Sequence, residues 1–190
     1  MKPESYLLAL AQNNAWANHR LLQACSALSQ EELEAPRIGF FPSLLATLNH
    51  ILIVDWFYVD ALEGGSLGPG AFVDDVPCRT LADLRREQAA VDRRLVALCA
   101  DLDDAALGKA VRLVRRDRIQ VERADRVLLH LFEHQIHHRG QAHGMLSGTP
   151  VAPPQLDEFF LAEEAPLRRH DLAALDWNEA DLWRDWPSRR

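Results

Sequence analysis

One short segment carries five of the eight histidines, and it constrains the fold more than any other part of the chain. It reads HLFEHQIHHRGQAH from His130 to His143, within a largely apolar stretch from 124 to 147. At about 100° per residue of α-helix, four histidines and a glutamine fall on one arc: His130, His134, His137, His138 and Gln141. The apolar positions lie on several sides of this helix, which predicts that it is mostly buried. Buried imidazoles need partners, because an unpaired buried polar group costs about 1–3 kcal/mol.

Histidines four residues apart on a helix can chelate a metal ion, since their rings lie one turn apart and reach an ion at about 2.0–2.1 Å. By spacing, His134 pairs equally well with His130 or with His138, and all three together are disfavoured by about 12 Å of helix rise between the outer two. A single histidine in an apolar helix is usually a core residue bonded to a carbonyl, and we expect His130 to be an ordinary buried polar group of this kind. The zinc-protease motif H-E-x-x-H is excluded, because Gln135 stands where the general base must be.

Four ranges show apolar residues at helical spacing and predict long helices: 4–28, 43–63, 81–100 and 124–147. Ser29 and Glu32 form a capping box, and Ser43 and Thr80 can each cap a long helix. Residues 64–79 hold four glycines and two prolines, which predicts a loop, while alternation over 111–121 predicts a short hairpin. The expected fold is all-α, a four-helix bundle with a possible hairpin before the fourth helix. Such bundles hold metal ions between facing helices.

A third metal ligand has to come from another helix. His50 is the natural candidate, because the second long helix is apolar around it. His19 on the first helix is the alternative, although its polar neighbours suggest a more exposed position. We expect His143 and Arg139 to point away from the histidine arc, and His170 to lie exposed in the charged tail.

Charge and cysteine content narrow the class of protein. The net charge is -7, and the arginines alternate with acidic residues, so a nucleic-acid binder is not expected. The three widely spaced cysteines form no C-x-x-C motif and suggest a reducing compartment. Residues 1–11 do not resemble a signal peptide, and the apolar stretch 51–62 is short and contains two aspartates. We therefore expect a cytoplasmic protein without a membrane span.

The sequence resembles the DinB family of helical bundles, which is also grouped with bacillithiol and mycothiol S-transferases. The resemblance is carried by LNHIL at 48–52 followed by Asp55, by HLFEHQIHHRGQ at 130–141, and by PPQLD at 153–157. It covers roughly residues 5–162. We therefore expect a bundle domain over 1–162 and an acidic, Trp-containing extension over 163–190, which holds Trp177, Trp183 and Trp186.

In that family a histidine of the second helix and the H-x-x-x-H pair of the fourth bind a divalent metal. The resemblance thus implies His50, His134 and His138 as ligands and a homodimer as the assembly. It also implies the transfer of a low-molecular-weight thiol to a small electrophile.

Two functions fit these observations. Three neutral imidazoles leave an open position on the ion, where a thiol would become nucleophilic, as a metal-dependent S-transferase or detoxification enzyme requires. Gln141 is a weak catalytic candidate, because it could orient a substrate or simply be a core amide. The alternative is a non-catalytic metal-binding protein of a stress response or a sensor. Three histidines accept several metals, of which we expect zinc or nickel.

Overall fold

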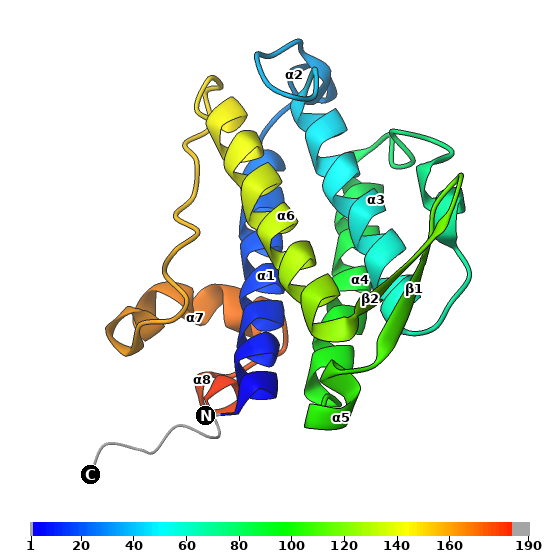
Figure 1. Cartoon of the computed structure of the whole chain (residues 1–190). Coiled ribbons are helices and arrows are strands. Elements are labelled where there is room, and N and C mark those ends of the chain that lie inside the picture. Colours follow the sequence, from blue (N-terminus) through cyan, green and yellow to red (C-terminus); the bar gives the residue numbers. More distant parts are fainter. Residues whose placement is uncertain (1, 184–190) are drawn as a thin grey trace.

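A computed structural model describes residues 2–183 of the chain. Its four long helices are α1 (Pro3–Cys25), α3 (Leu44–Leu62), α4 (Leu81–Ala100) and α6 (Ala124–Leu146). Helix α1 packs on α4 and α6, and α3 packs on the same two helices, so the four close into a bundle around one apolar core (Figure 1). The predicted all-α four-helix bundle is therefore confirmed.

The helices begin where the sequence predicts, because side chains satisfy their first N–H groups. Ser43 accepts a hydrogen bond from the backbone of Ala46, and Thr80 accepts one from Asp83. Ser29 and Glu32 form the expected capping box at the start of the short helix α2 (Gln30–Glu34). These local bonds set the entry of α3 and α4 into the bundle.

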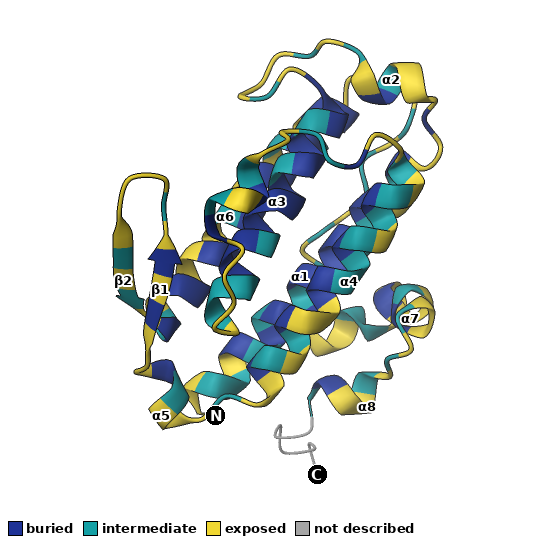
Figure 2. Cartoon of the chain, turned by 90° about the vertical axis from the view of Figure 1, so that its right-hand side faces the viewer, coloured by how far each residue is buried: buried dark blue, intermediate teal, exposed yellow. Residues whose placement is uncertain are grey.

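The predicted hairpin is present. Strands β1 (Ala110–Val114) and β2 (Ile119–Arg123) pair antiparallel, with Val114 opposite Ile119. The side chains of Val111 and Leu113 are buried, whereas β2 is largely exposed (Figure 2). Because β1 contacts α3 and both strands contact α6, the hairpin packs against both of these helices.

Some regular structure was not predicted. The stretch 64–79 contains a 3-10 helix, η1 (Gly68–Phe72), and the short helix α5 (Asp104–Leu107) precedes the hairpin. The expectation that α6 is buried on several sides is wrong at two positions. Leu129 and Ile136 are 56% and 58% exposed, because they lie on the side of α6 that faces away from the other helices.

The C-terminal extension folds back onto α1. It contains η2 (Ala162–Glu164), α7 (Ala165–Ala174) and α8 (Glu179–Leu182). A second apolar cluster joins it to the bundle and consists of Trp16, Ala17, Phe159, Leu172 and Leu182. Trp177 and Trp183 pack against this cluster, and Trp186 lies outside the described residues.

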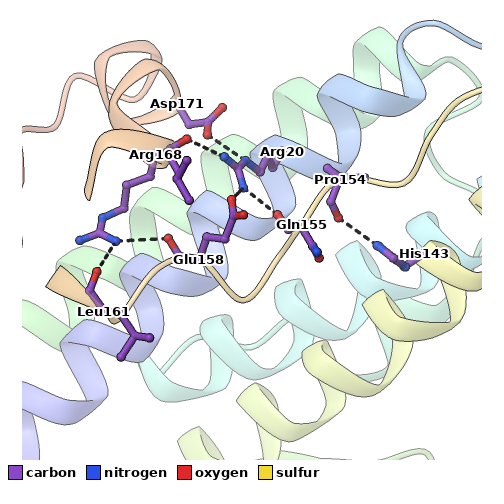
Figure 3. Close-up of polar contacts among 9 residues, drawn as sticks. Arg20, His143, Pro154, Gln155, Glu158, Leu161, Arg168 and Asp171 are labelled. Atoms are coloured by element: carbon purple, nitrogen blue, oxygen red, sulfur yellow. Dashed lines mark hydrogen bonds and ion pairs between the residues drawn. The ribbon is translucent and has the colours of Figure 1, made fainter. Parts of the chain in front are cut away.

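Arg20 on α1 holds the extension in place (Figure 3). Its guanidinium pairs with Glu158 at 2.8 Å and Asp171 at 2.9 Å, and it also donates to the carbonyl of Gln155 at 2.8 Å. His143 on α6 contacts the carbonyl of Pro154 through Nε2 at 2.9 Å. The segment between α6 and α7 is thus fastened to two helices of the bundle.

Helix α3 is long and apolar enough to cross a membrane, with a mean hydropathy of 1.2 over its most apolar 18 residues. However, 72% of these residues are buried inside the bundle. The apolar side chains of α3 therefore pack in the core of the bundle.

Candidate metal centre

His50 on α3 and His134 and His138 on α6 come together where these two helices pack against each other. One possible ligand atom from each lies within 4.8 Å of the others. The Nε2 atoms of His50 and His134 are 3.1 Å apart, and the ring centroid of His138 lies 4.6 Å from that of His50 and 4.4 Å from that of His134. The structure therefore brings together the three predicted residues, close enough to hold one metal ion.

The donor atoms fit a divalent ion. Two nitrogens at about 2.0–2.1 Å from a tetrahedral ion are about 3.3 Å apart, close to the observed separation of His50 and His134. No carboxylate or thiol belongs to this group within residues 2–183. Three imidazoles without a fourth protein ligand resemble the donor set of a catalytic metal site, which keeps one position open.

The three imidazoles are neutral near pH 7, as metal ligands must be. Burial, reinforced by the other histidines, lowers the pKa of His134 to about 3. Burial and the neighbouring His138 lower the pKa of His50 to about 4. Burial also lowers the pKa of His138, although its contact with Gln141 opposes the shift. Protonation of these rings is thus disfavoured even without an ion.

Gln141 lies beside the metal centre and contacts two histidines. Its Oε1 is 2.9 Å from Nδ1 of His138, and its Nε2 is 3.0 Å from Nε2 of His137. If the Nδ1 of His138 carries the proton, it donates to Gln141 and leaves Nε2 of His138 for a metal ion. Gln141 can therefore orient a ligand ring, as outer partners of metal ligands commonly do.

Two phenylalanines from the segment before α3 close one end of the centre. The Phe41 ring lies 4.3 Å from that of His50 and 5.6 Å from that of His138, and the Phe40 ring lies 6.3 Å from His138. Phe40 is 77% exposed, so this apolar wall also faces solvent. Neither ring was predicted from the sequence, because the segment before α3 carries no helical periodicity that would place its side chains.

The other histidines take different positions. His130 and His137 are exposed, so the expectation that His130 is an ordinary buried polar group is wrong. His130 instead contacts Tyr58, with 5.3 Å between ring centroids. His19 lines a separate pocket between α1 and α4, away from the three-histidine group.

A second polar cluster lies in the bundle core, on the neighbouring face of α6. Gln88 donates to Asp55 at 2.7 Å and to Asp92 at 3.1 Å, and Gln135 also contacts Asp55. Arg139 donates to Asn14 and Asn18, and both asparagines donate to Asp92. This core polar cluster comprises Asn14, Asn18, Asp55, Gln88, Asp92, Gln135 and Arg139, all buried.

Burial also shifts the charges of the core polar cluster. It raises the pKa of Asp55 well above its usual value, and Asp92 strengthens this effect. Burial raises the pKa of Asp92 to about 6 and lowers that of Arg139 to about 10. Because one guanidinium faces two carboxyl groups, burial favours the protonated form of Asp55. Gln135 now directs its Nε2 toward Asp55, and its Oε1 has no partner. If the side-chain amide is flipped, Oε1 can accept a hydrogen bond from the protonated carboxyl group of Asp55.

The core polar cluster has a signal in the sequence. Three polar pairs occur at i and i+4 within long helices: Asn14 with Asn18, Gln88 with Asp92, and Gln135 with Arg139. Each pair lies on one helix face and cannot be buried alone. Asp55 faces this cluster and does not join the histidines.

Comparison with known proteins identifies the family of this chain. The family model described as the DinB family matches residues 1–172, which include the three histidines and most of α7. A search of curated proteins finds no match. Since the match extends over most of the sequence, the chain belongs to the DinB family.

Proposed function

We propose that this protein binds one divalent metal ion, zinc or nickel, on His50, His134 and His138, and that it transfers a low-molecular-weight thiol to a small electrophile. The observation that carries the proposal is the group of three neutral imidazoles without a fourth protein ligand among residues 2–183. When bound, the ion would lower the pKa of a thiol at the open position and so keep it as a thiolate.

The residues around the ion support this chemistry. Gln141 fixes the ring of His138, and Phe41 covers one side of the His50 ring, which limits water there. The exposed ring of Phe40 offers an apolar contact to the electrophile. The thiol proton leaves to solvent, the sulfur forms a bond to the electrophilic carbon, and the group displaced from that carbon departs with its bonding electrons.

Cobalt-substituted protein tests the open position. Small thiols should produce a thiolate charge-transfer band, with a pH midpoint below the ~8.5 of a free thiol. His50→Ala should lose the band together with the metal, whereas His143→Ala should retain both. If no thiol changes the cobalt spectrum, the transferase proposal fails. The non-catalytic alternative, a structural or sensing metal protein, then takes its place.

We also propose a homodimer formed through α6. Leu129 and Ile136 are both more than half exposed, and seven residues of helix place them about 20° apart on one face. Gly140 continues this face, and no atom lies within 4 Å of the Cβ it would carry. Light scattering should give about twice the 21.5 kDa of one chain. Ile136→Glu should shift the protein toward monomer, whereas Glu133→Gln should not, and monomeric wild-type protein would contradict the dimer.

For the cellular location we propose the cytoplasm. Cys25, Cys78 and Cys99 are all free thiols in buried positions, as expected in a reducing compartment.

A further inference from the structure

A row of rings on α3 and α6 runs away from the metal centre. The His130 ring lies 6.4 Å from that of His134, and the Tyr58 ring lies 5.3 Å from that of His130. His130 is one helical turn before His134, and Tyr58 is two turns after His50. The row thus leads from the metal centre toward the hairpin, whose first strand contacts both helices (Figure 1).

A pocket of about 230 Å³ lies at the end of this row, under the hairpin. Its walls include Tyr58 from α3, His130 from α6 and Arg115 from the turn after β1. This volume is smaller than the ~300–1,000 Å³ of pockets that enclose a whole small molecule. The pocket therefore suits one end group of a ligand whose remainder extends past the exposed His130 ring toward the metal centre.

The Arg115 guanidinium is held in place but is not neutralised. Its carbon lies 4.6 Å from the centroid of the Phe57 ring, and one of its nitrogens donates to the Tyr58 hydroxyl at 3.1 Å. Within residues 2–183, no carboxylate lies within ion-pair distance of Arg115. Most of its five N–H donors are thus left for a ligand.

The other charged groups of the pocket compensate each other. Glu122 lies 3.3 Å from Arg126 and also accepts a hydrogen bond from Gln120. The remaining charge is the cation of Arg115. The hydroxyl of Tyr58 accepts from Arg115, so its own proton can be donated to an acceptor in the pocket. A guanidinium beside a hydroxyl donor matches a carboxylate, which accepts at both oxygens.

We propose that Arg115, Tyr58 and His130 form a subsite for the carboxylate of a small organic substrate whose reactive end lies at the metal centre. This inference rests on the proposed function for the role of the metal, but binding of a carboxylate can be tested without it. The subsite would select acidic thiols or acidic electrophiles over neutral ones.

The direct test follows Arg115 by NMR in the zinc-loaded protein, with propionate as the probe. The Nε–Hε resonance of Arg115, assigned by its loss in Arg115→Met, should shift in a saturable manner. Arg116→Met is the matched control, because Arg116 is the exposed neighbour and does not line the pocket, and it should leave the titration unchanged. If propionate does not shift the Arg115 resonance, the subsite is overturned, whether or not thiols change the cobalt spectrum.

The second test uses the cobalt protein and pairs of probes, ω-mercaptocarboxylic acids and the matching ω-mercaptoalcohols of increasing chain length. At lengths that reach from the metal centre to Arg115, the acid should bind about tenfold more tightly than the alcohol, as expected for a charge-assisted hydrogen bond. Arg115→Met should abolish this advantage and Arg116→Met should preserve it. Tyr58→Phe should reduce it, which provides a second variant should Arg115→Met fail to fold.

The outcomes separate the two proposals. If thiols change the cobalt spectrum but acids and alcohols bind equally at every length, the subsite is overturned and the transferase proposal stands. If no thiol changes the spectrum while propionate shifts Arg115, the subsite stands and the transferase proposal fails.

Discussion

Helix α6 carries two polar clusters on neighbouring faces, the metal centre and the core polar cluster. Both begin from a pair of residues at i and i+4, His134 with His138 and Gln135 with Arg139. The two clusters differ in how their polar atoms are satisfied. In the core, amides, carboxyl groups and the guanidinium bond to one another, and Oε1 of Gln135 is the one buried side-chain atom of the cluster without a partner among residues 2–183. In the metal centre, Nδ1 of His134 is buried without a partner and its Nε2 contacts only another imidazole.

This difference distinguishes a structural cluster from a binding site. The core polar cluster compensates most of its own charge and needs no ligand. The metal centre gathers neutral nitrogens, none of which stabilises the others strongly. It therefore gains most from an external cation, and substitutions should affect metal affinity in one cluster and folding in the other.

The largest expected effect is loss of metal from the histidine variants. Wild-type protein purified without chelator should contain about one divalent ion per chain, and His134→Ala or His138→Ala should remove most of it. The affinity should fall by more than the roughly 10–100-fold that loss of an outer partner causes. Elemental analysis measures the occupancy, with His143→Ala and His170→Ala as controls. Full occupancy in both ligand variants would exclude the site.

A large loss of stability is expected in the core polar cluster. Arg139→Met leaves Asp92 without its cation and two asparagine oxygens without a donor, so unfolding by urea should cost about 3–5 kcal/mol less. Asp55→Asn should have a much smaller effect, because burial favours the neutral form of the native carboxyl group. The measurement uses chelator-treated protein. Equal losses in the two variants would show that Asp55 is charged.

Gln141→Ala should weaken metal binding without altering the fold. Loss of the contact with His138 frees that ring, and outer partners of this kind are worth about 10–100-fold in affinity. Competition with a chromophoric chelator measures the change, and circular dichroism should show unchanged helix content. An unchanged metal affinity would mean that Gln141 does not position the ligand.

The smallest effect concerns pH, where the two clusters act in opposite directions. Burial lowers the pKa of His134 to about 3, so between there and the ordinary value of about 6.5 the unfolded chain binds more protons, and stability rises with pH. Burial raises the pKa of Asp92 to about 6, so between about 3.9 and 6 the folded chain binds more protons, and stability falls as pH rises.

Urea unfolding of chelator-treated protein between pH 4 and 6 should separate these contributions. Asp92→Asn should make stability rise more steeply with pH, and His134→Ala should make the rise shallower. Each difference is at most about 1.4 kcal/mol per pH unit, the value for one proton. Identical pH profiles for both variants would contradict the opposed shifts.

The sequence by itself determined the features that depend on neighbours in the chain. Helical spacing placed His134 and His138 on one face of one helix, and Ser43 and Thr80 marked where two helices begin. The apolar helix around His50 made it the candidate for the third ligand, and the family motif then favoured His134 with His138 over His130 with His134. Such features follow from 3.6 residues per turn and from the N–H groups at a helix start, which are the same in every fold.

Only the tertiary structure decided which distant residues meet. It directed Gln135 and Arg139 into the core beside Asp55 and Asn14, and it exposed Leu129 and Ile136. It also brought Arg115 from the hairpin onto Tyr58 of α3, 57 residues away in sequence. These contacts depend on the rotation and register of each helix. Packing of the whole core sets both, because a rotation of α6 by one residue, about 100°, would exchange its metal-binding face for its structural one.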